Sequence, residues 1–234
     1  MNIVRILTIG GEPINFTSMA LTLDRDAPGR GVIVAQTPKN PEGEVAVDAG
    51  IDGDINRYFT GYIESAVRVD GHQIRLYVRE FSGVLEKRCP VALRNVKISD
   101  CVAAVAGLTG LKLQGLGPWL ERPVARFLNL GSGFDALREI GQLSGLEHYV
   151  ARPMPKPWVW LGDRAAIKNF DQAFEFPTSF FTAMSVSGGD CRFVPQLRPG
   201  MRLWIGGSEE KVITKLDTAG ATMRINFEKS DYDV

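Results

Sequence analysis

The chain has 234 residues, of which 44% are hydrophobic and 23% charged, which is ordinary for a folded protein of one or two domains. Its 27 basic and 27 acidic side chains cancel, so the charge shows no sign of the basic face that nucleic-acid binding requires. Three widely spaced cysteines, Cys89, Cys101 and Cys191, argue against a disulfide framework or a zinc site. No apolar run approaches the roughly 20 residues of a membrane helix, and no signal pattern opens the chain, so we expect cytoplasmic synthesis and no membrane span.

The first 90 residues carry β-strand patterns. Leu21 and Leu23 alternate with polar residues at the period of two that a half-buried strand requires. Two further strands, over 59–69 and 73–81, are separated by Asp70-Gly71, which predicts a hairpin with a two-residue turn. In both strands we expect alternate apolar residues to face a core, and the polar ones to face water. Residues 1–90 are therefore predicted to form one β domain.

The middle of the chain changes to a helical pattern. Ser99 is a predicted N-cap, because apolar residues follow it at helical spacing until Gly110. These residues are Val102, Val105 and Leu108. We predict a short helix that ends at Gly110, where glycine accepts a left-handed backbone.

The same design recurs 35 residues later. Ser132 precedes a second apolar series, which consists of Phe134, Leu137, Ile140 and Leu143 and which Gly145 ends. Asp135 stands three residues after Ser132, close to a capping box. We interpret the pair as a duplicated helix–Gly–strand unit, although any two short amphipathic helices would align in this way.

The last third of the chain returns to β patterns. Strands over 146–151 and 158–162 are expected to pair around the proline-rich segment 152–157, where prolines cannot donate ladder hydrogen bonds. Beyond about residue 166, short strands recur about every ten residues, a spacing typical of a small barrel or sandwich. The predicted fold is α+β and predominantly β. It has two tube-like β-barrel or sandwich domains, 1–90 and 166–234, which flank an α/β insertion with two short helices, 91–165.

The search for chemistry finds no convincing site. Asp52-Gly53-Asp54-Ile55-Asn56 begins like a calcium loop but lacks the glycine and the bidentate glutamate such a loop needs, so we favour a polar turn. Cys101 falls in the first turn of a predicted helix, where a thiol can become reactive, but its sequence neighbourhood favours a core residue. His72, in a turn, and His148, on a strand, have no matching acid and nucleophile. We therefore predict no catalytic, cofactor-binding or metal-binding residue, no cofactor and no enzymatic activity.

Four tryptophans offer an alternative. A sugar-stacking platform is one use for Trp119, Trp158, Trp160 and Trp204, but we favour a core or a subunit contact, because tryptophans dominate such interfaces. The sequence does not decide between core and subunit contact. Paired hydrolase carboxylates need no local motif. A β-rich carbohydrate-binding or hydrolase module is therefore the main alternative function.

Three segments, in order, carry a resemblance to a known family. They are Tyr58-Phe59-Thr60-Gly61-Tyr62-Ile63-Glu64 with its following strand to Phe81, residues 134–163 from Phe134-Asp135-Ala136-Leu137 to Trp158-Val159-Trp160-Leu161-Gly162-Asp163, and Leu197-Arg198-Pro199-Gly200-Met201. Together they resemble phage tail baseplate hub proteins of the late-control type, which are related to the spike base of type VI secretion. The resemblance spans nearly the whole chain.

The resemblance implies a structural virion protein at the tail tip, made in the host cytoplasm. It implies a homotrimeric ring that joins the tail tube, or a distal tail protein, to a spike or central fibre, with the tape-measure protein as a further partner and no specific nucleic acid. Because the chain ends at Val234 without a lysozyme domain or a needle, we expect the spike to be a separate protein, or the tail to be of a type without a spike. A hexameric tail-tube or tail-terminator subunit is a further alternative.

Overall fold

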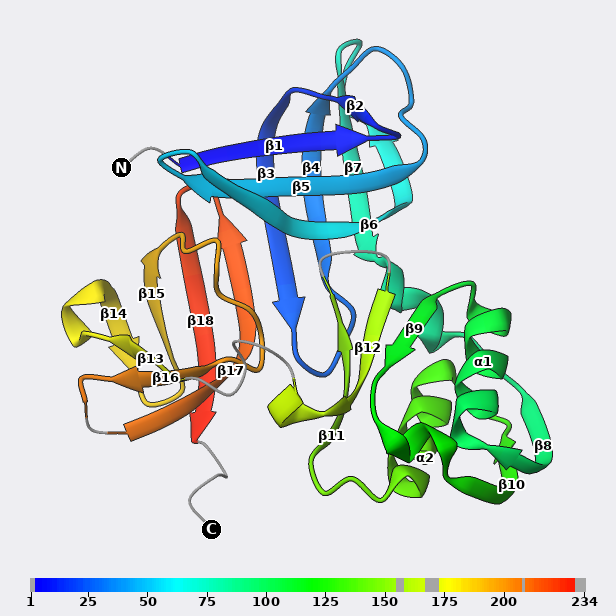
Figure 1. Cartoon of the computed structure of the whole chain (residues 1–234). Coiled ribbons are helices and arrows are strands. Elements are labelled where there is room, and N and C mark those ends of the chain that lie inside the picture. Colours follow the sequence, from blue (N-terminus) through cyan, green and yellow to red (C-terminus); the bar gives the residue numbers. More distant parts are fainter. Residues whose placement is uncertain (1–2, 155–157, 167–172, 208, 230–234) are drawn as a thin grey trace. The chain divides into compact units, whose positions relative to one another are not determined.

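The structure is a computed structural model that describes residues 3–154, 158–166, 173–207 and 209–229 (Figure 1). The chain divides into two compact units. Unit 1 consists of Met1–Glu80 and Asn169–Val234, and unit 2 consists of Phe81–Lys168. The two predicted β segments thus meet in unit 1, and the predicted insertion lies in unit 2. The division into three domains stays a prediction.

Unit 1 is built from strands of both ends of the chain. From the N-terminal part come β1 (Ile3–Ile9), β2 (Glu12–Pro13), β3 (Phe16–Asp24), β4 (Arg30–Gln36), β5 (Glu44–Ile51), β6 (Asp54–Arg68) and β7 (Gln73–Glu80). From the C-terminal part come β13 (Ala173–Phe176), the 3-10 helix η4 (Thr178–Phe180), β14 (Phe181–Ser185), β15 (Gly188–Arg192), β16 (Arg202–Ile205), β17 (Glu209–Ala219) and β18 (Thr222–Lys229).

These strands form one open sheet. Its order is β14-β15-β18-β17-β3-β4-β7-β6-β5-β1-β2, with β16 pairing β17 and β13 pairing β16. The long strand β17 joins the two groups, because it pairs with β16 up to Val212 and then with β3 from Lys215 onward. A bulge in its pairing with β18 between Ile213 and Lys215 marks this change. In the described residues the sheet therefore continues instead of closing. The predominantly β fold is confirmed, the barrel form of the prediction is wrong, and the arrangement as two sandwich-like domains stays a prediction.

The predicted apolar faces are confirmed in part. Leu21 and Leu23 are buried, and so are all three of Ile74, Leu76 and Val78. The end of β6 and the residue after it differ from prediction, since Val67 in β6 and Val69 just beyond it are about half exposed. Pairing with β5 ends at Tyr62, so the rest of β6 pairs only with β7 and extends beyond the core.

The turn that joins β6 to β7 also differs. It spans residues 69–72, not two residues. The Asp70 carboxylate accepts hydrogen bonds from the backbone N–H groups of His72 and Gln73, at 2.7 and 2.8 Å. This side-chain cap stabilises a longer loop than Asp-Gly alone predicts.

Unit 2 has helices packed beside two small sheets. Its elements are η1 (Phe81–Glu86), β8 (Val91–Lys97), α1 (Ile98–Thr109), β9 (Lys112–Gly115), η2 (Pro118–Glu121), β10 (Pro123–Asn129), α2 (Gly133–Ser144), β11 (Tyr149–Pro153), β12 (Trp158–Asp163) and η3 (Arg164–Ala166). Strands β8 and β10 form an antiparallel ribbon, and the second sheet has the order β11-β12-β9. No helix among the described residues is long and apolar enough to cross a membrane.

Two helix–Gly–strand units are present, as predicted, and their origin as a duplication stays a prediction. α1 and α2 have 12 residues each, and Gly110 and Gly145 both end them with a φ of 70°. The strands that follow, β9 and β11, flank β12 in one sheet. In sequence, β11 begins at Tyr149 rather than at 146, and part of the predicted proline turn, 155–157, lies outside the described residues.

The two helix starts differ in how well the sequence predicted them. Ser132 caps α2 as expected, with its hydroxyl accepting from the Asp135 N–H at 3.2 Å and the Asp135 carboxylate accepting from the Ser132 N–H at 2.9 Å. For α1 the N-cap is Lys97, not Ser99, and the Asp100 carboxylate accepts from the Lys97 N–H at 2.8 Å. Leu108, predicted for the buried face of α1, is 58% exposed. The acid three residues after the cap therefore indicates the start of α1 better than the serine does.

Candidate assembly surfaces

The calcium-like segment is a tight turn. Asp52 and Gly53, with φ of 50° and 98°, connect β5 and β6 as a two-residue hairpin. Asn56 donates to the Asp54 carboxylate at 2.9 Å within the same turn. Among the described residues no group of three or more His, Cys, Asp or Glu side chains could hold a metal ion. The polar-turn interpretation is confirmed.

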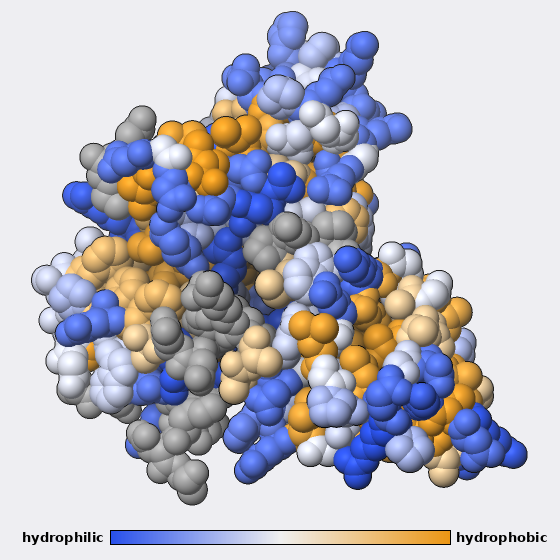
Figure 2. All heavy atoms as spheres, in the orientation of Figure 1, coloured by the Kyte–Doolittle hydropathy of each residue, from blue (hydrophilic) through white to orange (hydrophobic). Residues whose placement is uncertain are grey.

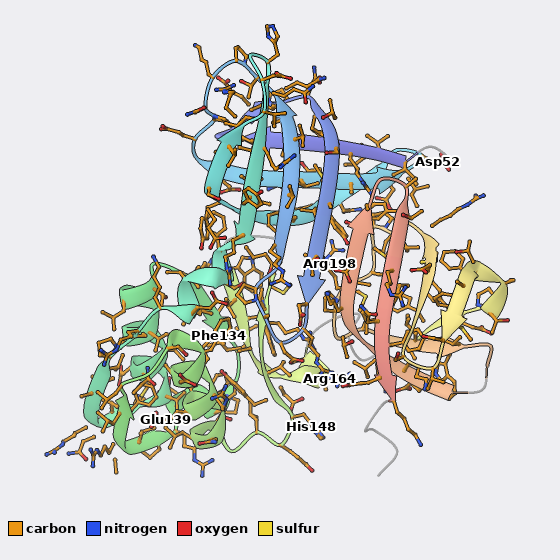
Figure 3. All side chains as sticks on the ribbon, turned by 180° about the vertical axis from the view of Figure 1, so that it is seen from behind. Asp52, Phe134, Glu139, His148, Arg164 and Arg198 are labelled. Atoms are coloured by element: carbon orange, nitrogen blue, oxygen red, sulfur yellow. The ribbon has the colours of Figure 1, made fainter. Side chains whose placement is uncertain are left out.

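The cysteines lie in the interior of the protein, and the two histidines lie on its surface. All three cysteines are buried and free. Burial, together with the nearby charges of Asp100 and Glu139, raises the pKa of the Cys101 thiol to about 11, so this thiol is protonated at neutral pH. His72 is exposed as expected, and His148 is exposed in the turn before β11 rather than on a strand (Figure 3). Cys101 is thus a core residue.

The four tryptophans differ in burial. Trp119 and Trp160 are 8% and 7% exposed. Trp119 Nε1 donates to the Leu116 carbonyl at 2.9 Å, and its ring packs edge-on against Tyr149. Trp158 is half-buried on β12, and Trp204 is 39% exposed on β16. Trp119 and Trp160 therefore belong to the core.

The two ends of the sheet in unit 1 are open. At one end β14 pairs, among the described strands, only with β15. At the other end β1 pairs with β5 along its whole length, but the two-residue strand β2 covers only Thr8 and Ile9 of its outer edge. Unpaired strand edges are templates for pairing with another chain. The first half of β1 and the length of β14 are therefore candidate assembly edges.

Apolar side chains accompany the β1 edge. Registers across β1, β5 and β6 bring Val4, Gly50 and Ile55 into one row, with Ile6 two residues further along the same face of β1. Ile6 and Ile55 are each 39% exposed. Figure 2 shows apolar residues gathered over this end of the three strands. Residues 3–7 include apolar residues on both faces of the strand, which is typical of a strand that is covered on both sides. This pattern is the sequence signal from which the patch could have been found.

Exposed apolar side chains also occur at the β14 end. Met184 is 52% exposed, and Val186, at the tip of the β14–β15 hairpin, is 88% exposed. A hairpin tip in contact with water normally carries turn-forming polar residues. The two open ends of the sheet thus share an unusual content of exposed apolar side chains.

A groove crosses the outer face of the same sheet. It has a volume of about 700 Å³. One row of cross-strand neighbours along it is charged or polar and consists of Arg79, Arg30, Thr22, Asp217, Arg224 and Asp190. The next row has small side chains and consists of Val32, Ala20, Ala219 and Thr222. Charges in the first row are mostly neutralised within the sheet, for example by Arg224–Asp190 at 3.3 Å and Arg79–Glu64 at 3.5 Å.

Two arginines hold the segment between β15 and β16 against the N-terminal strands. The Arg198 guanidinium donates to the carbonyls of Pro195, Leu197 and Arg57 at 2.7, 2.7 and 2.9 Å, and lies 4.8 Å from the centre of the Tyr58 ring. Arg5 lies 4.3 Å from the centre of the Phe193 ring, which packs edge-on against Tyr58. Burial lowers the pKa of both arginines. Figure 3 shows Arg198 between the N-terminal and C-terminal strands of unit 1.

Comparison with solved structures places this fold among phage tail proteins. A tail protein from Neisseria meningitidis MC58 superposes with a TM-score of 0.71 at 11% identity, covering 99% of this chain and 97% of that one. The 43 kDa tail protein of prophage MuSo2 from Shewanella oneidensis gives a TM-score of 0.68 at 12% identity, with 96% of each chain covered. The E. coli c3393 protein, a type VI secretion component described as similar to the phage T4 tail proteins gp27 and gp5, gives 0.61 at 10% identity, covering 97% and 77%.

Sequence comparison finds a relative encoded by a phage. An uncharacterized 58.7 kDa protein of Haemophilus phage HP1 is 22% identical over 202 residues. The match covers 86% of this chain, and the chain spans 38% of the length of that relative. No protein-family model matches the sequence. The resemblance to phage tail proteins is therefore confirmed at the level of the fold.

Proposed function

We propose that the chain is a structural, non-enzymatic subunit of the baseplate hub of a phage-type tail. In this role three copies form a ring at the tail tip, which joins the tail tube or a distal tail protein to a spike or central fibre. The tape-measure protein is a further proposed partner. Solved tail proteins that cover nearly the whole chain at similar length support this role, and the phage relative supports it from sequence.

The observation that carries the proposal is the open sheet of unit 1 with unpaired strands at both ends. When β14 of one copy meets the edge of β1 in the next, the contact is head-to-tail, and such contacts close into a ring when the rotation between copies permits. The exposed apolar residues Ile6 and Val186 lie beside these edges, so pairing there also removes apolar surface from water. In this arrangement each copy contributes the same two edges.

The mass of the purified protein tests the ring. Light scattering is expected to give three times the chain mass of 25.7 kDa. Ile6→Lys places a charge beside the β1 edge and is expected to reduce the mass to one copy. Leu108→Lys is the matched control, because Leu108 is also exposed but lies on the helix α1 of unit 2 and not on a strand edge. Six copies would favour a tube or terminator subunit, and a trimer unaffected by Ile6→Lys would show that this edge is not the contact.

A further inference from the structure

The ribbon of β8 and β10 in unit 2 has an inner and an outer face. On the inner side Val91, Val124 and Phe127 are buried in the hydrophobic core that α1 and α2 share. On the outer side the register places Ala92 opposite Leu128 and Arg94 opposite Arg126. All four outer side chains are exposed. The outer face is thus a compact patch of two arginines beside two apolar residues.

The charge of this patch is uncompensated. Neither strand contains an aspartate or glutamate. Lys97, the third basic residue of the ribbon, is already paired with Glu121 at 2.7 Å, whereas within the described residues neither Arg94 nor Arg126 has an acidic partner. Like charges directly opposite each other across a strand pair are unfavourable. The groove of unit 1 differs, because there Asp190, Asp217 and Glu64 lie among the arginines.

One edge of the ribbon is also open. Among the described strands β8 pairs only with β10. On the far side of β10, by contrast, the Leu128 N–H donates to the Glu139 carboxylate of α2 at 3.4 Å. The outer edge of β8 therefore offers backbone donors and acceptors next to the two arginines.

We propose that this patch, the β8 edge together with Arg94 and Arg126, docks an extended acidic segment of another protein. The segment adds as a third strand beside β8, a mode in which backbone hydrogen bonds give affinity and alternate side chains give specificity. Residues two apart in a strand share a face, so an Asp or Glu beside Arg94 places an apolar residue beside Ala92. The carboxylate accepts hydrogen bonds from the guanidinium groups, and the apolar side chain covers Leu128 and Ala92.

Charge decides which kind of occupant fits. A second copy of the ribbon would bring two further arginines and no acid, so self-association through this face is disfavoured. Nucleic-acid affinity at physiological salt comes from many phosphate contacts, and two arginines supply few. The preference for an acidic protein segment holds whether or not the chain forms the proposed ring.

A pair of synthetic peptides tests the docking. The labelled probe is Thr-Val-Thr-Glu-Thr-Val-Thr, and its counterpart has Lys in place of Glu. Fluorescence anisotropy with the full chain is expected to show at least tenfold tighter binding of the Glu peptide at low salt. The double variant Arg94→Glu/Arg126→Glu is expected to reverse this preference. In hydrogen exchange, the Glu peptide is expected to protect amides of β8.

The matched control is Arg68→Glu/Arg75→Glu, which changes the net charge equally but lies on the exposed β6–β7 hairpin of unit 1. It is expected to keep the preference for Glu. Arg94→Gln/Arg126→Gln removes the like-charge pair, and is expected to abolish the preference with an unchanged or higher melting temperature. Equal binding of both peptides, a preference that survives loss of both arginines, or no protection of β8 would each overturn the proposal.

Discussion

Replacing Arg198 by Met removes the contact that ties the segment between β15 and β16 to the N-terminal strands. The side chain keeps its length but loses three hydrogen bonds to backbone carbonyls, one of which belongs to Arg57 on β6. Hydrogen bonds from a charged donor contribute about 1.5–3 kcal/mol each, and the lost hydration of the guanidinium offsets part of the sum. Stacking on Tyr58 adds about 1 kcal/mol.

The net loss is therefore about 3 kcal/mol of unfolding free energy, or roughly 6–12 °C in melting temperature for a domain of this size. Thermal unfolding followed by circular dichroism measures it. Arg224→Met is the matched control, because its exposed ion pair with Asp190 is expected to contribute under about 1 kcal/mol. A melting temperature for Arg198→Met equal to that of the control would refute the reasoning.

Three further predictions concern local structure. Gly61→Ala is expected to cost more than about 4 kcal/mol, since a Cβ there would clash with a backbone carbonyl of β7, whereas Gly71→Ala, which has open space around it, should be tolerated in the same urea titration. Ser132→Ala should cost about 1 kcal/mol through loss of the α2 cap, and an unchanged midpoint would contradict the capping role. Burial raises the thiol pKa of Cys101 and Cys191 from 9.0 to about 11, so the folded state keeps these two protons up to a higher pH than the unfolded state does. Stability should then fall between pH 9 and 11, and the double Ala variant should lose much of this slope.

Helices and the buried faces of strands could be predicted from the sequence where the residues that determine them lie within a few positions of one another. The two helices were found from apolar spacing and from Gly110 and Gly145, whose left-handed backbone ends both. The alternation of Ile74, Leu76 and Val78 likewise gave the buried face of β7 correctly. Both patterns can be seen in a short stretch of sequence, because the side chains on one face of a helix or strand recur every few residues.

Partners far apart in the sequence could not be predicted in this way. Thr218 of β17 donates to the Leu21 carbonyl of β3 at 3.2 Å, although 197 positions separate them. Strand alternation shows which face of a strand is buried but not which strand lies beside it, so the sequence predicted two separate barrel or sandwich domains and not the single open sheet. Val67 and Val69 show the same limit, because whether an alternating face is buried depends on what the fold brings against it.

The candidate surfaces were missed for a related reason. The sequence search sought motifs of catalysis and metal binding, and such motifs are not what defines these surfaces. Exposed Ile6 and Val186, and the opposed Arg94 and Arg126, become meaningful only once register and exposure are known. An assembly surface is a property of the folded sheet rather than of a short motif.

Cryo-electron microscopy of assembled tails tests the central claim most directly. The account predicts density for three copies of this chain in a ring at the junction between the tail tube and the spike or fibre, with β14 of each copy beside β1 of the next. Density elsewhere in the particle, six copies per ring, or a ring whose contacts avoid both sheet ends would contradict it.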